Sequence, residues 1–85
     1  MSIEWKVFGM FTLYTRPECG LCEEAKLMLG LVQEDFPVEW NEVNIERDDV
    51  LHEKYMLMIP VLERDGEIVL YGNIGYADLI EALID

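Results

Sequence analysis

The spacing of hydrophobic residues changes along the chain, and each change marks the boundary of a predicted element. Residues Val7–Thr15 are rich in β-branched and aromatic side chains, which is typical of a buried strand. From Gly20 to Glu34 the apolar residues recur three and four positions apart, so they share one face of a predicted helix. Pro37 follows and ends this helix, because proline has no N–H to continue the hydrogen bonding.

The middle of the chain predicts a second strand and a short helix. Apolar and polar residues alternate, with one slip, from Val38 to Ile45, which favours a strand. Asp48 or Asp49 is then placed to accept hydrogen bonds from the first N–H groups of a helix that extends to about Met56. The first predicted strand, the first helix and this second strand form a βαβ unit, which predicts that the two strands are parallel and joined by a right-handed crossover.

The last third predicts a hairpin and a terminal helix. The runs Pro60–Glu63 and Glu67–Tyr71 flank an Asp-Gly pair, a strong signal for two antiparallel strands. Helical spacing of apolar residues returns from Tyr76 to Ile84. The order β-α-β-α-β-β-α predicts an α/β fold in which a four-stranded mixed sheet has helices on both faces. A chain of 85 residues supports one core, so we expect a single domain over residues 1–85.

The chain is strongly acidic, with 18 Asp and Glu residues against 6 Lys and Arg, and a net charge of −12. This balance argues against nucleic acid and anionic membranes as partners, because few cations are present to bind phosphates. Its uncharged stretches are far shorter than the roughly 20 residues that span a bilayer. The first residues lack the pattern of a signal peptide. We therefore expect a cytoplasmic protein, monomeric, that attracts basic partner surfaces.

The only two cysteines stand three positions apart, where the first predicted strand leads into the first helix. Cys19 lies at the helix start, where unpaired N–H groups and the helix dipole favour a thiolate, and Cys22 follows one turn later on the same face. Structural zinc would need about four ligands, whereas the chain offers two thiols and His52. Two inert buried cysteines are the other alternative. Cys-x-x-Cys opening a helix in this setting predicts a thiol–disulfide redox site without a metal.

The sequence Tyr-Thr-Arg-Pro-Glu-Cys-Gly-Leu-Cys at residues 14–22 resembles the active-site stretch of the glutaredoxin/thioredoxin superfamily, most closely that of small glutaredoxin-like proteins. Arg16 stands where this family has a basic residue three positions before the first cysteine. Ile59-Pro60 matches the family's cis proline, although the residues alone favour a trans bond. The resemblance extends from about Phe11 to the C-terminus and implies a thioredoxin fold.

The start of the last predicted helix resembles the end of the family's Gly-Gly-x-x-Asp motif, at which glutathione binds. Ile74 replaces the first glycine, and Ala77 replaces a residue that often has a polar side chain. The acidic surface also suits an anionic tripeptide poorly. Asp78 is suited either to orienting a ligand amine or to capping the helix. The substrate-binding residues that the resemblance implies are Arg16, Ile59, Pro60, Gly75, Tyr76 and Asp78.

The resemblance implies a disulfide reductase in which Cys19 attacks a protein disulfide or a glutathione mixed disulfide and Cys22 resolves the intermediate. We expect no tightly bound cofactor, with glutathione as a candidate co-substrate and a flavin thioredoxin reductase as the alternative electron donor. Tyr14, Leu21 and Tyr76 are candidates for an apolar rim around Cys19, with core packing as the alternative for both tyrosines. The competing hypothesis is a non-catalytic binding module or an iron–sulfur carrier.

Overall fold

The computed structural model describes residues 10–84. Its elements are β1 (Met10–Thr15), α1 (Gly20–Asp35), β2 (Glu39–Asn44), the 3₁₀ helix η1 (Ile45–Arg47), α2 (Asp49–Tyr55), β3 (Val61–Arg64), β4 (Glu67–Tyr71) and α3 (Tyr76–Ile84). The predicted succession is confirmed, except that Val38 precedes β2, Ile45 begins η1 and Pro60 precedes β3. The part of the predicted first strand that precedes Met10 lies outside the described residues. Across residues 10–84, no helix is long and apolar enough to cross a membrane.

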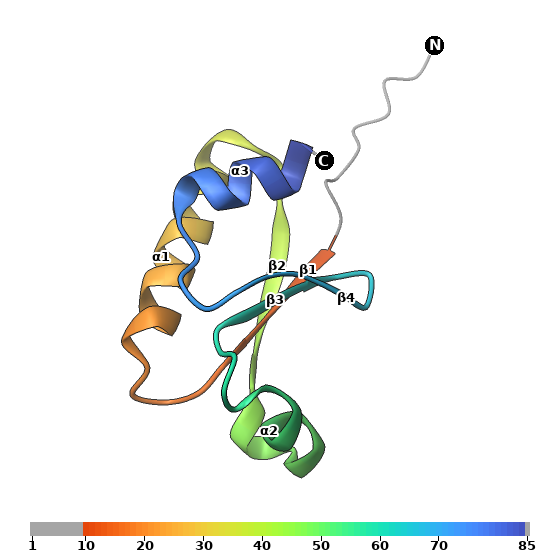
Figure 1. Ribbon diagram of the computed structural model, residues 1–85. Coiled ribbons are helices and arrows are strands. Elements are labelled where there is room, and N and C mark those ends of the chain that lie inside the picture. Colours follow the sequence, from red (N-terminus) through yellow and green to blue (C-terminus); the bar gives the residue numbers. More distant parts are fainter. Residues whose placement is uncertain (1–9, 85) are drawn as a thin grey trace.

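The four strands form one sheet in the order β2-β1-β3-β4 (Figure 1). β1 and β2 are parallel, whereas β1 with β3 and β3 with β4 are antiparallel. The predicted hairpin is present, and both turn residues adopt left-handed backbone angles, with φ of 54° at Asp65 and 83° at Gly66. Positive φ at both central positions defines the turn type that suits the twist of a hairpin. Because it contains both parallel and antiparallel pairs, the sheet is mixed, as predicted.

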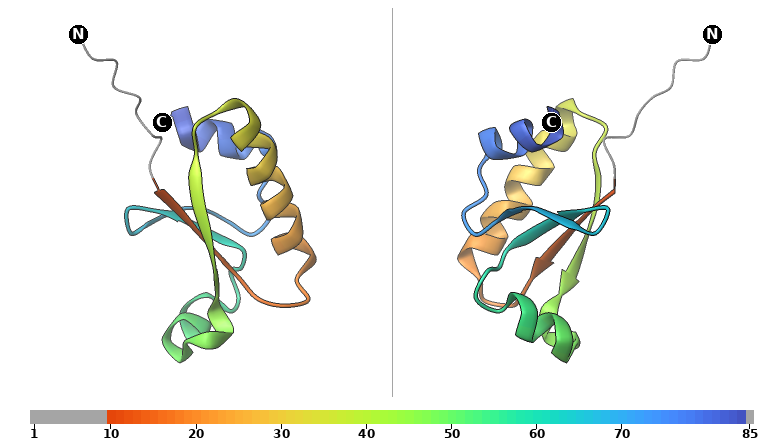
Figure 2. Two further views of the ribbon diagram at one scale, coloured as in Figure 1. Left: turned by 180° about the vertical axis from the view of Figure 1, so that it is seen from behind. Right: turned by 45° about the vertical axis from the view of Figure 1, so that its right-hand side comes forward.

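The larger core lies between the sheet and the helices α1 and α3, which cover the same face (Figure 2). Alternate residues of β1 point into it, because successive side chains of a strand face opposite sides. The inward face of α1 supplies residues three and four positions apart. Its buried members are Phe11, Leu13, Ala25, Leu29, Val32, Val38, Leu62, Ile74 and Leu79. This layer fixes the start of α1 relative to the end of β1.

A smaller core lies on the opposite face, where η1 and α2 pack at one end of the sheet (Figures 1 and 2). Ile45, Tyr55 and Val61 are its fully buried members. The N-cap residue of α2 is Asp48, whose Oδ1 accepts the N–H of Val50 at 2.8 Å. The helices thus cover both faces of the sheet, as predicted, and the second core supports the loop that leads into β3.

Candidate functional site

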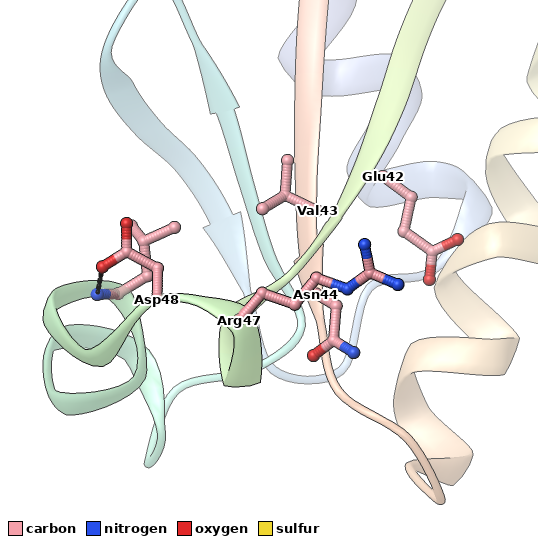
Figure 3. Close-up of a pocket in the computed structure, with 6 residues that line it drawn as sticks. Glu42, Val43, Asn44, Arg47 and Asp48 are labelled. Carbon is pink, nitrogen blue, oxygen red and sulfur yellow. Dashed lines mark hydrogen bonds between the residues drawn. The ribbon is translucent and has the colours of Figure 1, made fainter.

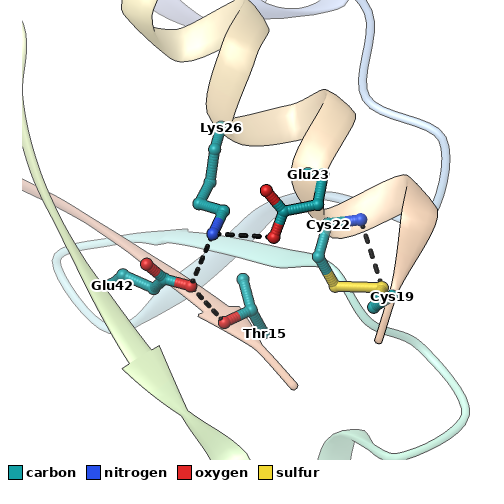
Figure 4. The surroundings of a disulfide bond; sticks show 6 residues. All are labelled: Thr15, Cys19, Cys22, Glu23, Lys26 and Glu42. Carbon is teal, nitrogen blue, oxygen red and sulfur yellow. Dashed lines mark hydrogen bonds and ion pairs between the residues drawn. A yellow bond between two sulfur atoms is a disulfide. The ribbon is translucent and has the colours of Figure 1, made fainter. Parts of the chain in front are cut away.

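The two cysteines lie at the turn from β1 into α1 and are joined by a disulfide (Figure 4). Cys19 is the N-cap residue of α1, and its Cα lies 5.2 Å from that of Cys22. Cys22 is fully buried on the inward face of the helix, whereas Cys19 is partly exposed. One cysteine is therefore within reach of solvent, and the other lies behind it.

The start of α1 provides hydrogen-bond donors to Cys19. The N–H of Cys22 donates to Cys19 Sγ at 3.1 Å, and the N–H of Glu23 donates to the Cys19 carbonyl oxygen at 3.1 Å. An N–H that faces this sulfur will stabilise negative charge on it once the disulfide is reduced, as will the positive end of the helix dipole. Of the two sulfurs, that of Cys19 is therefore the better placed to be a thiolate.

A chain of polar contacts near the disulfide joins α1 to the sheet (Figure 4). Lys26, one turn after Cys22, lies 2.9 Å from Glu23 Oε2 and 3.3 Å from Glu42 Oε2. The Thr15 hydroxyl donates to the same Glu42 oxygen at 2.7 Å. The hydrogen bond to Glu23 and, less strongly, that to Glu42 raise the pKa of Lys26 against the opposing effect of burial. Sequence reasoning missed these contacts, because no local pattern links residues 15, 26 and 42.

The loop between α2 and β3 carries the predicted proline, and the Ile59-Pro60 peptide bond is cis, as the resemblance implied. The antiparallel pairing of β1 with β3 places the end of β1, which leads to Cys19, beside the start of β3. Figures 1 and 2 show this loop and the turn before α1 at the same end of the sheet. Pro60 is buried, and its carbonyl accepts the N–H of Gly72 at 2.8 Å.

The bond from Gly72 brings the segment before α3 to the proline loop. The N–H of Gly75 donates to Asp78 Oδ2 at 3.0 Å, so Asp78 caps the start of α3. A Cβ added at position 75 would lie 3.3 Å from this oxygen, a tight contact that the carboxylate would relieve by moving a few tenths of an ångström. Ile74 is buried in the larger core, and Ala77 is exposed. One oxygen of Asp78 is thus engaged by its own helix.

The side chains expected around Cys19 have different surroundings. Leu21 and Tyr76 are exposed, at 44% and 38% of their full surface. Arg16 is exposed as well, and it has no ion pair within residues 10–84. Tyr14, in contrast, packs in the smaller core, where its ring centroid lies 4.9 Å from that of Tyr55. Tyr14 is therefore half-buried against the smaller core, and the two exposed side chains are left as candidates for the rim.

The hydroxyls of Tyr14 and Tyr55 both donate to the carboxylate of Glu63. Burial raises the pKa of both tyrosines above the ordinary value, and the hydrogen bond and negative charge of Glu63 raise it further. The unfolded chain therefore loses these phenolic protons at lower pH than the folded protein does. The two phenols contribute stability that is fully present below the ordinary tyrosine pKa of about 10 and is lost as the pH rises toward the raised values.

We expect the free energy of unfolding to decline more steeply above about pH 10 in the parent protein than in Tyr55→Phe. The variant lacks the phenol whose pKa is raised most, so its alkaline loss is smaller. Urea unfolding at a series of pH values measures both slopes. Parallel slopes would show that Tyr55 has the same pKa in the folded and unfolded chains.

A surface hollow lies at the end of β2, and it shares Glu42 with the polar contacts near the disulfide (Figure 3). It measures about 640 Å³ and is lined by Glu42, Val43, Asn44, Arg47, Asp48 and Leu51. These residues come from β2, η1 and α2, and none belongs to the cysteine turn, the proline loop or the start of α3. The lining contains both polar and apolar side chains, and both signs of charge are present. The hollow therefore indicates no particular ligand.

The sheet order, the helices on its two faces and the cysteine pair opening α1 define a small protein of the thioredoxin fold with a thiol redox motif. The family model for the glutaredoxin-like domain (DUF836) matches residues 10–84. The chain therefore belongs to the glutaredoxin-like domain family.

Solved structures of similar chains support the fold. A structural-genomics target protein from X. campestris is 28% identical, with a TM-score of 0.76 over 87% of this chain and 95% of that one. A mutant thioredoxin from Halobacterium salinarum is 19% identical, with a TM-score of 0.63 over 87% of this chain and 70% of that one. A malarial protein is 13% identical, with a TM-score of 0.63 over 88% and 92% of the two chains. The last two likenesses support the fold alone.

Proposed function

We propose that the protein is a thiol–disulfide oxidoreductase that reduces disulfides in protein substrates. The observation that carries this proposal is the asymmetry of the cysteine pair. Cys19 is partly exposed and its sulfur accepts the N–H of Cys22, whereas the side chain of Cys22 is fully buried. An accessible, stabilised thiolate with a second thiol behind it is the arrangement that thiol–disulfide exchange requires.

The reaction begins from the reduced dithiol. The Cys19 thiolate attacks one sulfur of the substrate disulfide, forms a mixed disulfide and releases the other substrate sulfur as a thiolate. Cys22 then loses its proton and attacks Cys19 Sγ, which breaks the mixed disulfide and releases the second substrate thiolate. Two protons complete the two product thiols, and an external dithiol or flavoprotein reductant restores the reduced form.

A substrate segment would lie along the proline loop. The N–H of Ile59 already donates to the Tyr55 carbonyl at 3.1 Å, so the Ile59 carbonyl is the main-chain group left for a substrate N–H. The side chains of Leu21 and Tyr76 are exposed and would supply apolar contacts to the substrate, and the exposed Arg16 would supply a positive charge. These contacts suit an extended polypeptide.

Glutathione is the less favoured substrate at this site. The family's aspartate has one oxygen engaged by the N–H of Gly75, and Ile74 fills part of the core where the motif has glycine. The net charge of −12 also disfavours an anionic tripeptide. A flavin thioredoxin reductase is accordingly the electron donor that we propose, in the cytoplasm, for a monomeric protein.

Two coupled assays test this choice. We expect reduction of insulin disulfides in the presence of thioredoxin reductase and NADPH, and little reduction of a glutathione mixed disulfide by glutathione. The reverse pattern would assign the protein to the glutathione-dependent class. Inactivity in both assays would contradict the oxidoreductase proposal.

A further inference from the structure

One carboxylate on the face opposite the disulfide accepts hydrogen bonds from two tyrosines, of which Tyr55 is buried and Tyr14 is half-buried. Glu63, on β3, accepts the hydroxyl of Tyr14 at 3.1 Å, and its second oxygen accepts the hydroxyl of Tyr55. The two rings lie 4.9 Å apart, and Tyr55 is only 1% exposed. Because Tyr14 belongs to β1 and Tyr55 ends α2, this carboxylate ties the helix to two neighbouring strands.

The main chain of Tyr55 holds the proline loop. Its carbonyl accepts the N–H of Met58 at 2.8 Å and the N–H of Ile59 at 3.1 Å. Met58 and Ile59 also pack against the smaller core that contains the Tyr55 ring. One residue is thus fixed to the sheet through its side chain and to the loop through its backbone. A helix of only seven residues depends on such tertiary contacts, because an isolated helix of this length is unstable in water.

We propose that Glu63 is a positioning residue that places Ile59-Pro60 for substrate binding, acting through Tyr55. This inference rests on the proposed function, in which the loop binds the substrate backbone. The hydrogen bonds that Glu63 accepts come from the two tyrosines, and neither of them involves a cysteine. Its removal should therefore weaken substrate binding and leave the thiol chemistry at Cys19 intact.

Two variants that lose the same chemical group separate this role from general stabilisation. Tyr55→Phe and Tyr14→Phe each remove one hydroxyl that donates to Glu63. Only Tyr55 also accepts hydrogen bonds from the main chain of the proline loop. In Tyr55→Phe we expect amide hydrogen exchange at Met58 and Ile59 to accelerate about tenfold, because local opening becomes easier. For insulin reduction, KM should rise about threefold or more with kcat little changed, the signature of lost substrate binding. Tyr14→Phe should leave both measurements close to those of the parent.

Glu63→Gln tests the carboxylate itself. A glutamine side chain has one acceptor oxygen for two hydroxyls, so we expect exchange at Met58 and Ile59 to accelerate in this variant too. Glu67→Gln, which removes the same charge from an exposed position on β4, is the matched control and should have no effect.

Either of two results would overturn the inference. One is unchanged exchange at Met58 and Ile59 in both Tyr55→Phe and Glu63→Gln. The other is equal acceleration in Tyr14→Phe and Tyr55→Phe, which would indicate a general loss of stability. Hydrogen exchange reports on the loop without any substrate. Failure of the proposed enzymatic function would appear instead as inactivity of the parent protein.

Discussion

A Cys22→Ser protein should form a mixed disulfide between Cys19 and its substrate, and this adduct should persist. Because the second thiol is absent, only a thiol from solution can cleave the mixed disulfide. An intramolecular thiol held by the fold reacts at a far higher effective concentration, and we expect turnover to fall about a thousandfold or more. The adduct should be visible as an increase in mass under non-reducing conditions and should disappear with dithiothreitol.

The matched control is Cys19→Ser, which retains the buried thiol alone. Because Cys22 is fully buried, this variant should neither turn over nor form an adduct. An adduct in Cys19→Ser but not in Cys22→Ser would reverse the two roles. Normal turnover by Cys22→Ser would remove the resolving step from the mechanism.

Ile74→Gly should destabilise the fold strongly, although it restores the glycine of the family's motif. Ile74 is only 2% exposed and packs in the larger core beside Leu79. Truncating a buried isoleucine to alanine costs about 2–5 kcal/mol, and glycine adds about 0.5–1 kcal/mol through the extra freedom of the unfolded backbone. Small domains are stable by only about 5–15 kcal/mol, so a large part of the stability would be lost.

Urea unfolding measures this loss, with Ala77→Ser as the control. Ala77 is exposed, so its replacement by the polar residue type common in the family should change the free energy of unfolding by no more than about 0.5 kcal/mol. If Ile74→Gly were as stable as the parent and reduced glutathione mixed disulfides, Ile74 would have a role in excluding glutathione rather than in packing.

Most elements were predictable because they depend on neighbours a few positions apart. The helix Gly20–Asp35 follows from apolar residues at helical spacing, and the hairpin turn follows from Asp65-Gly66, which adopts positive φ at both positions. Boundaries were less certain. Ile45 continues the alternation of the strand, but in the structure it begins η1, because the side chain of Asn44 caps this helix by accepting the N–H of Glu46.

The sequence by itself determined the cysteine turn: a strand end, a helix start and two thiols one turn apart are all encoded within residues 15–22. Only the tertiary structure decided how the surrounding polar groups are paired. Thr15 meets Glu42 across 27 positions, and Tyr14 meets Glu63 across 49. The physical reason is that a buried polar group binds the partner that the packed strands bring to it. No local pattern specifies a partner so distant along the chain, whereas helix capping and thiolate stabilisation act within a single turn.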